Sequence, residues 1–176
     1  MKYALIVMSC FVLALTSYAS VSRADSPVAA VDVRKLIETS SAGKSIQVAL
    51  KAKRDVLQKE ANAFEKKMRD QEQALIQERK TIKPEDFEVK KKAFEENFVK
   101  TRQSIVKKTT DLDNQRKAAL RKLQEQIAKA TADIADEKKI KIVVDRELVV
   151  IVDQTLDLTD EVLKKVDERV KSIPLE

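Results

Sequence analysis

The sequence is poor in residues that make tight turns and in residues that carry chemistry. Its 176 residues include one glycine, three prolines, one cysteine and no histidine or tryptophan, and only 4% are aromatic. β-Sandwiches and Rossmann domains need more turn residues than this. Disulfide scaffolds, Cys/His zinc sites and histidine-based catalysis are excluded because the residues are missing. We therefore expect a mostly helical protein that acts by binding, not an enzyme, with no cofactor and no metal.

The first 24 residues have the pattern of a secretory signal peptide. Lys2 supplies positive charge, and the apolar run Ala4–Leu15 is shorter than the roughly 20 residues that span a bilayer. Small residues suited to cleavage end at Ala19 and at Ala24. Cleavage after Ala24 is preferred because a charged, proline-containing segment then begins the mature chain; an uncleaved anchor is the alternative. Cleavage would remove the only cysteine, Cys10, and leave four aromatic residues, all phenylalanine.

Two long helices are expected on either side of Pro84. No other proline and no glycine lies within residues 44–138, which are rich in Lys, Glu, Gln and Ala and so favour helix. The predicted helices are 44–80 and 85–138, roughly 55 Å and 80 Å long at about 1.5 Å per residue. Proline suits the first turn of the second helix, so the pair should form an antiparallel hairpin with its tip at 81–86.

Apolar residues recur at heptad spacing in both predicted helices. The repeats are Leu50, Leu57 and Phe64 in the first helix, and Phe98, Ile105 and Leu112 in the second. Such a narrow stripe is typical of a two-helix coiled coil. Because the helices are unequal, the apolar stripe of residues 123–134 has no partner within the hairpin and must pack against something else.

The segments that flank the hairpin are expected to form a small body. Runs rich in β-formers at 28–33, 140–145 and 148–153 predict strands, and a last helix is predicted from Leu158 with Thr159 as its N-cap. The expected organisation is a signal peptide at 1–24, a β-rich body at 25–43 and 139–176, and an arm at 44–138, which is an α+β fold. A body this small rarely supplies enough core alone, so oligomerisation through strand edges and the unpaired stripe is predicted. The candidate interface residues are Val31, Val33, Leu123, Ile127, Ile134, Val143 and Val150.

Two motifs with chemical associations are better explained as structural. Gly43-Lys44-Ser45 is similar to the end of a phosphate-binding loop, but Glu38 stands where that signature needs another glycine. A helix start with a flexible glycine is therefore preferred. Asp145, Asp153, Asp157 and Asp160 lack the spacing of a calcium loop and are expected to serve as turn and helix-dipole residues.

The predicted arm is basic. Residues 44–138 contain 24 Lys and Arg against 17 Asp and Glu. One interpretation is a solvated helix face whose charges pair along the helix, and an equally weighted one is a field that attracts an acidic partner. Export removes the protein from nucleic acid, so anionic lipid, lipopolysaccharide or acidic polypeptides are the partners expected.

Several blocks occur together in the order and spacing of one family. They are 28–33, Ser41-Ala42-Gly43-Lys44, the tip region 83–96, 142–145 and, most specific, 156–165. Through them the sequence resembles the OmpH family of Skp-like periplasmic chaperones along nearly all of the mature chain. The resemblance implies a jellyfish-like homotrimer, in which a β-rich trimerisation body carries three coiled-coil arms around a cavity. It also implies an ATP-independent holdase without catalytic residues, which keeps unfolded outer-membrane proteins from aggregating before membrane insertion. Residues 149–153 depart from the family, whose members often have an aromatic residue there.

On this resemblance, basic and aromatic residues near the tip are the candidates for client contact. They are Lys66, Lys67, Arg69, Arg79, Lys80, Lys83, Phe87, Lys90, Lys91, Lys92 and Phe94. Packing in the seam between the helices is the first interpretation of Phe87 and Phe94, and a position facing the client cavity is the second. The alternative function is a structural coiled-coil envelope protein that spaces or bridges folded partners.

Overall fold

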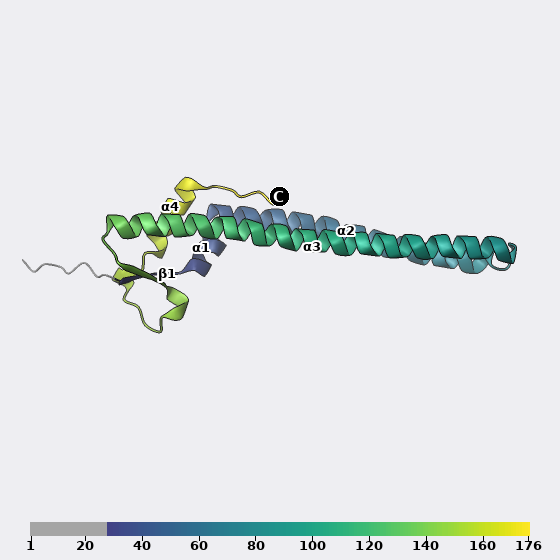
Figure 1. Cartoon of the computed structure of the whole chain (residues 1–176), viewed down its shortest axis with the longest axis horizontal. Coiled ribbons are helices and arrows are strands. Elements are labelled where there is room, and N and C mark those ends of the chain that lie inside the picture. The colour runs from purple at the N-terminus through teal and green to yellow at the C-terminus, as the bar shows by residue number, and fades with distance from the viewer. Residues whose placement is uncertain (1–27) are drawn as a thin grey trace, which may run out of the picture.

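A small body with one long helical hairpin projecting from it makes up residues 28–176, the part of the chain that the computed structural model describes (Figure 1). The elements in order are β1 (Val28–Val31), α1 (Val33–Thr39), α2 (Ser41–Glu78), α3 (Pro84–Glu137), β2 (Ile142–Asp145) and α4 (Thr159–Arg169), with single 3-10 turns at Arg146–Leu148 and Gln154–Leu156. The predicted signal peptide, with its cleavage sites at Ala19 and Ala24, lies outside the described residues. Within residues 28–176 no helix combines the length and the apolar character needed to cross a membrane.

The two long helices run antiparallel and turn at Pro84 (Figure 1). Lys83 has an extended backbone (φ −65°, ψ 146°), which is what the residue before a proline prefers. Pro84 then opens α3, and Glu85 and Asp86 place negative charge at its positive N-terminal end. The predicted hairpin is confirmed, although α2 begins at Ser41 and so reaches further into the body than expected.

Three polar pairs across the hairpin set its register. Lys90 Nζ lies 2.5 Å from Glu78 Oε2, Lys108 Nζ lies 2.6 Å from Glu60 Oε2, and Lys53 Nζ lies 2.7 Å from Gln115 Oε1. All three pairs are centred on position 84 in the sequence. The helices therefore keep one register from the tip to the root, and Lys108, which interrupts the apolar stripe, contributes to it.

The core of the body is built from both ends of the described chain and from the root of the hairpin. Leu36 of α1, Ile46 of α2, Leu123 of α3 and Val162 of α4 are all fully buried. The apolar stripe of α3 from Leu123 to Ile134 packs in this core, where α3 contacts α1 and α4. The stripe thus finds its partner outside the hairpin but within its own chain, so one copy of the chain is enough to cover it.

The sheet has two parallel strands. Val28 of β1 lies opposite Ile142 of β2, and on the other side of β1 the backbone N–H of Leu158 donates to the carbonyl of Ala30 (2.9 Å). The prediction of a strand at 148–153 is wrong: Leu148 ends the first 3-10 turn, and residues 149–153 are irregular. Both edges of β1 are taken, by β2 and by Asp157, and the segment does not pair with the outer edge of β2 either.

A helix that the sequence did not predict, α1, joins the sheet to the arm. Asp32 caps it by accepting from the backbone N–H of Lys35 (2.7 Å). Ser40 both closes α1 and opens α2: its N–H donates to the carbonyl of Leu36, and its Oγ accepts from the N–H of Gly43 (3.1 Å). Gly43 is buried in the first turn of α2, so the interpretation of a flexible glycine is wrong.

Candidate functional site

Three of the four phenylalanines of the arm gather in one cluster between its helices. The ring centroids of Phe64 and Phe98 are 5.7 Å apart and those of Phe94 and Phe98 are 6.5 Å apart, both in tilted arrangements. Such spacings are typical of favourable aromatic pairs. The rings are only partly covered, and Phe98 keeps 36% of its surface exposed. The cluster therefore holds the seam together and also presents apolar surface.

An open groove of about 790 Å³ runs beside this cluster. Its lining is mostly apolar and comes from both helices: Ala61, Phe64, Met68, Phe94, Phe98, Ile105 and Val106. Charged residues of both signs stand around it: Glu65, Glu72, Arg69 and Arg102. The ring of Phe94 packs against Phe98 in the seam, as its first interpretation expects, and it also lines the groove. Heptad counting had assigned Phe64 and Phe98 to the seam alone and so missed their part in the groove.

At the tip, Phe87 is covered by a cation. The guanidinium carbon of Arg79 lies 5.8 Å from the centroid of the Phe87 ring, within the range of a cation–π contact. Phe87 is half-buried there and does not line the groove. This pair closes the end of the hairpin over the turn.

Most of the candidate cations of the outer arm are free of carboxylate partners. Lys90 is paired with Glu78. Within the described chain, Lys66, Lys67, Arg69, Lys80, Lys83, Lys91 and Lys92 have no carboxylate oxygen within 4.0 Å. Lys66 and Lys67 also line a shallow depression on α2 with Asp70. The outer arm thus combines an apolar groove with cations that form no ion pair with its own acidic residues.

The predicted interface residues fall into three groups. Val31, Leu123, Ile127 and Ile134 are buried inside the body of a single chain, whereas Val33 and Val143 are half-buried. Val150 is 99% exposed and lies between two other exposed aliphatic residues, Leu148 and Ile151. Among the described residues of the body, these three are the most exposed large apolar side chains.

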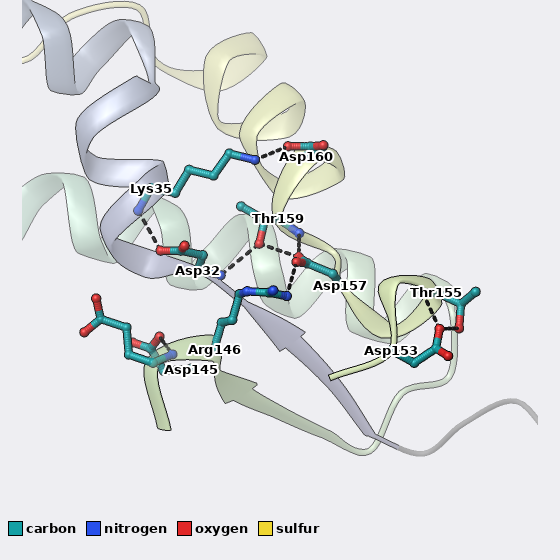
Figure 2. A network of polar contacts seen from close by, with 10 residues as sticks. Asp32, Lys35, Asp145, Arg146, Asp153, Thr155, Asp157, Thr159 and Asp160 are labelled. Carbon is teal, nitrogen blue, oxygen red and sulfur yellow. Dashed lines mark hydrogen bonds and ion pairs between the residues drawn. The ribbon is translucent and has the colours of Figure 1, made fainter. Parts of the chain in front are cut away.

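A network of polar contacts ties the start of the described chain to its last helix (Figure 2). The Thr159 hydroxyl accepts from the backbone N–H of Asp32 (2.8 Å) and donates to Asp157 Oδ1 (2.5 Å). The backbone N–H of Thr159 also donates to Asp157 (2.9 Å), and Arg146 pairs with the other carboxylate oxygen (2.8 Å). Thr159 is therefore the first residue of α4 and not its N-cap, a correction to the sequence prediction. Leu158 is the N-cap and makes no side-chain cap bond, and Asp157 instead accepts from Thr159, one of the first-turn N–H groups that have no partner within the helix.

The remaining aspartates of this region act in the same structural way (Figure 2). Asp145 accepts from the N–H of Glu147 (3.1 Å), Asp153 accepts from the N–H of Thr155 (2.8 Å), and Asp160 pairs with Lys35 (2.8 Å). The Thr155 bonds hold the pKa of Asp153 below its ordinary value. The prediction that these aspartates serve turns and helix starts is confirmed, and they stabilise the body rather than form a site.

The comparisons with known proteins agree with this architecture. The family described as "Outer membrane protein (OmpH-like)" matches residues 27–166. The chain belongs to the OmpH-like family. The fold of this OmpH-like chain is also similar to the crystal structure of a candidate outer-membrane chaperone (OmpH-like) from Caulobacter crescentus CB15, with a TM-score of 0.80. The two share 17% identity over 86% of this chain and 89% of that one. No curated protein sequence matches.

In the OmpH-like chain, then, the surfaces available for binding lie on the arm and on one loop of the body. The groove around Phe98 and the unpaired lysines offer weak apolar and electrostatic contacts distributed over a long surface. Within residues 28–176 no cluster of three or more metal-ligating side chains occurs. The arrangement suits the reversible binding of extended or flexible polypeptides.

Proposed function

We propose that this protein is an ATP-independent holdase chaperone of the periplasm, which captures unfolded outer-membrane proteins and prevents their aggregation before membrane insertion. Membership of the OmpH-like family supports the chaperone role, and so does the similar fold of the Caulobacter protein, which is described as a candidate OmpH-like outer-membrane chaperone. The predicted signal peptide supports export. In this proposal the arm, residues 44–138, holds the client, and the body, residues 25–43 and 139–176, joins the subunits.

The observation that carries the proposal is the open groove beside Phe64, Phe94 and Phe98. A folded partner would offer a fixed complementary surface, but an unfolded chain offers scattered apolar side chains in changing positions. Half-exposed rings on a long helical pair can meet such side chains at many points, each contact weak and reversible. Several weak sites around one cavity then hold a client through avidity, without nucleotide-driven release.

The unpaired cations of the outer arm provide long-range electrostatic attraction for the client. Lys66, Lys67, Lys91 and Lys92 lie on both helices, and their field would speed the capture of clients with net negative charge. This contribution should weaken as salt rises, because the screening length falls to about 8 Å at physiological ionic strength. Anionic lipid headgroups and lipopolysaccharide would meet the same cations at the membrane surface.

A homotrimer is the proposed assembly, and the loop around Val150 is its proposed contact. Leu148, Val150 and Ile151 are each more than 80% exposed, an unusual position for three neighbouring aliphatic residues. They follow β2 in the chain, and the outer edge of β2 pairs with no strand among the described residues. A second copy could cover the apolar loop and pair with this edge, so a segment with β-forming residues would gain the partner that it lacks in one chain.

The function is tested by diluting a urea-unfolded outer-membrane β-barrel protein into buffer with or without the purified full chain and following light scattering. We expect suppression of aggregation that is stronger at low salt. Phe98→Ser should weaken suppression, whereas Val89→Ser, an exposed arm residue outside the groove, should not. Equal protection by the two variants would contradict a role of the groove.

The charge contribution has its own matched pair of variants. One carries Lys66→Gln, Lys67→Gln, Lys91→Gln and Lys92→Gln on the outer arm; the other carries Lys51→Gln, Lys129→Gln, Lys164→Gln and Lys171→Gln at the root and on the body. Both lose the same net charge. Only the outer-arm set should slow capture at low salt. Absence of any protection by the wild-type chain, together with tight binding of one folded partner, would favour a structural envelope protein instead.

A further inference from the structure

We propose that residues 170–176, which follow α4, are a strap that clamps the root of the hairpin and fixes how much of the arm moves with the body. In Figure 1 this segment leaves α4 and runs back along the arm, beside both long helices. It has no regular secondary structure. Its contacts, described next, lie on α2 and α3 alike.

The strap is anchored by apolar side chains. Ile173 is only 6% exposed and belongs to the same core cluster as Ile46 and Leu50 of α2. Leu175 packs against that cluster and is half-buried. Between these anchors and the helix, the backbone N–H of Ile173 donates to Ser45 Oγ (3.2 Å). A segment without helix or strand is therefore fixed by burial and by a hydrogen bond to the first turns of α2.

Polar contacts hold the far end of the strap to both helices. Lys53 of α2 donates to the carbonyl oxygen of Leu175 (3.2 Å) and to Gln115 Oε1 of α3 (2.7 Å). Lys122 of α3 pairs with the side chain of Glu176 (3.0 Å). One lysine thus joins the strap and the opposite helix at the same point, and the strap bridges α2 and α3 directly.

The strap ends where the continuous core ends. The buried residues of the core cluster extend into the hairpin as far as Leu50 on α2 and Leu112 on α3, and the partly buried Leu57 packs against their outer end. Among the described residues 51–111 Met68 is the single fully buried apolar residue, and it lies outside that cluster. Local opening costs little where few apolar contacts are buried. The strap therefore reinforces the last part of the hairpin that is tied to the body, and the arm is free to bend beyond it.

Because of the strap, residues 44–53 and 115–122 of the arm move together with the body as one rigid unit. Releasing it would move the boundary between the rigid and bending parts of the arm toward the body. Its effect on how wide a client cavity opens rests on the proposed function, but the strap itself can be measured without a client.

The test is hydrogen exchange of the backbone amides in the intact, client-free protein. In Lys53→Ala/Lys122→Ala, which leaves the body core untouched, amides of residues 46–53 and 115–122 should exchange about fivefold faster, since two exposed polar contacts of modest strength are lost. In Ile173→Ala the same amides should exchange roughly tenfold faster or more. Residues 57–75 and 94–108 should change less than about twofold in both.

The matched control is Lys51→Ala/Arg121→Ala, which removes the same charges from the same helices. Neither of these residues makes a hydrogen bond or ion pair with the strap, and both are exposed. The control should exchange like the wild type. Exchange at the root that is equal in the control and in the Lys53/Lys122 variant would overturn the strap. Equally faster amide exchange along the whole chain in Ile173→Ala would also overturn the proposed strap. Such a result would mean that the body as a whole is destabilised, not that the root of the hairpin is released.

Discussion

The carbonyl oxygen of Ile37 occupies the space where a side chain on Gly43 would begin. A Cβ on Gly43 would stand 1.8 Å from this oxygen and 3.0 Å from Ser40 Oγ. The backbone of α1 therefore crosses directly over the first turn of α2, and the single glycine of the chain is required for this close approach.

Gly43→Ala should accordingly destabilise the protein. At an unhindered helix position alanine is more favourable than glycine by about 1 kcal/mol, so the sign of the effect is diagnostic. Here α1 must move, and we expect a loss of about 1–3 kcal/mol in the free energy of unfolding, measured by urea denaturation. The neighbouring exposed substitution Lys44→Ala is the control and should be near neutral. A more stable Gly43→Ala protein would contradict the close approach.

Lys139→Gly should stabilise the protein. Lys139 has a φ of 57°, the one positive φ among the non-glycine residues of the described chain. It follows α3 in a Schellman arrangement, in which the N–H of Ile140 donates to the carbonyl of Ala135 and that of Lys139 to the carbonyl of Asp136. The left-handed conformation costs a residue with a side chain about 1–2 kcal/mol, part of which glycine loses again in the unfolded state. A net gain of about 0.5–1 kcal/mol in thermal or urea unfolding is expected. Lys138→Gly, at a residue with φ −94°, should give no gain.

The stability of the body should fall in acid because of Asp157. Burial works against its charge, but hydrogen bonds from the Thr159 hydroxyl and backbone N–H and the charges of Arg146 and Lys35 outweigh it and hold the pKa below the ordinary 3.8. A carboxylate whose pKa is lowered by folding stabilises the protein above its unfolded pKa, and the contribution is lost as pH falls through the folded value.

Asp157→Asn isolates this effect, since the amide oxygen still accepts from Thr159 but the pairing with Arg146 is lost. We expect the variant to be less stable than the wild type by about 1–2 kcal/mol at pH 7. The difference should stay constant between pH 5 and 8 and shrink below about pH 4. Glu168→Gln, on the exposed face of α4, is the control. A difference that persists unchanged at pH 2 would rule out the charge as its source.

The pair Glu60–Lys108 should behave as a register lock between the two arm helices. Glu60→Lys and Lys108→Glu each place like charges together and should each destabilise the hairpin, whereas the double exchange should recover most of the loss. The expected coupling is about 0.3–1 kcal/mol for a half-exposed pair, and it should weaken in high salt. Thermal unfolding of the four proteins measures it. Additive single effects would show that the 2.6 Å contact contributes nothing to register.

Val150→Asp should reduce the oligomeric state if the proposed trimer uses the exposed loop. A charge at the centre of a covered apolar contact is costly, whereas in a single chain this residue is 99% exposed and its replacement should leave the fold intact. The mass in solution reports the oligomeric state, and the circular dichroism spectrum reports separately whether the fold is intact. Val48→Asp, at an exposed residue of α2, controls for the loss of an apolar side chain. An unchanged mass in Val150→Asp would place the contact elsewhere.

The structure of the arm could be predicted from the sequence because the patterns that determine it are local. Pro84 marks the turn, and the long stretch without glycine and the heptad repeats mark the two helices. Each of these patterns depends on only one or two helices, so both the hairpin and the position of its tip could be predicted. Gly43 was also singled out, but for the wrong reason. Glycine is required at position 43 because of the carbonyl of Ile37, and the position of this carbonyl depends on how α1 packs. The helix α1 is itself too short to show a strong periodic pattern in the sequence.

The body could be predicted less well because its structure depends on contacts between distant segments. A run such as 148–153 has the composition of a strand, but whether it forms one depends on how it packs and pairs with distant segments. Predicting the groove would have required still more information than the sequence pattern contains. Phe94 and Phe98 are four residues apart and so share a helix side, yet their partial exposure follows from the spacing of the two helices and not from the heptad pattern.

The parallel pairing of Val28 with Ile142 has a consequence for the order in which the chain folds. These strands are separated by the whole arm, so closing the sheet from an open chain would cost the entropy of a very long loop. The hairpin removes most of that cost, because it can zip up from contacts near Pro84 and carry its two ends to within reach of each other. A chain that emerges N-terminus first therefore has an arm well before it has a body. The part that is proposed to hold clients would be assembled before the part that is proposed to join the subunits.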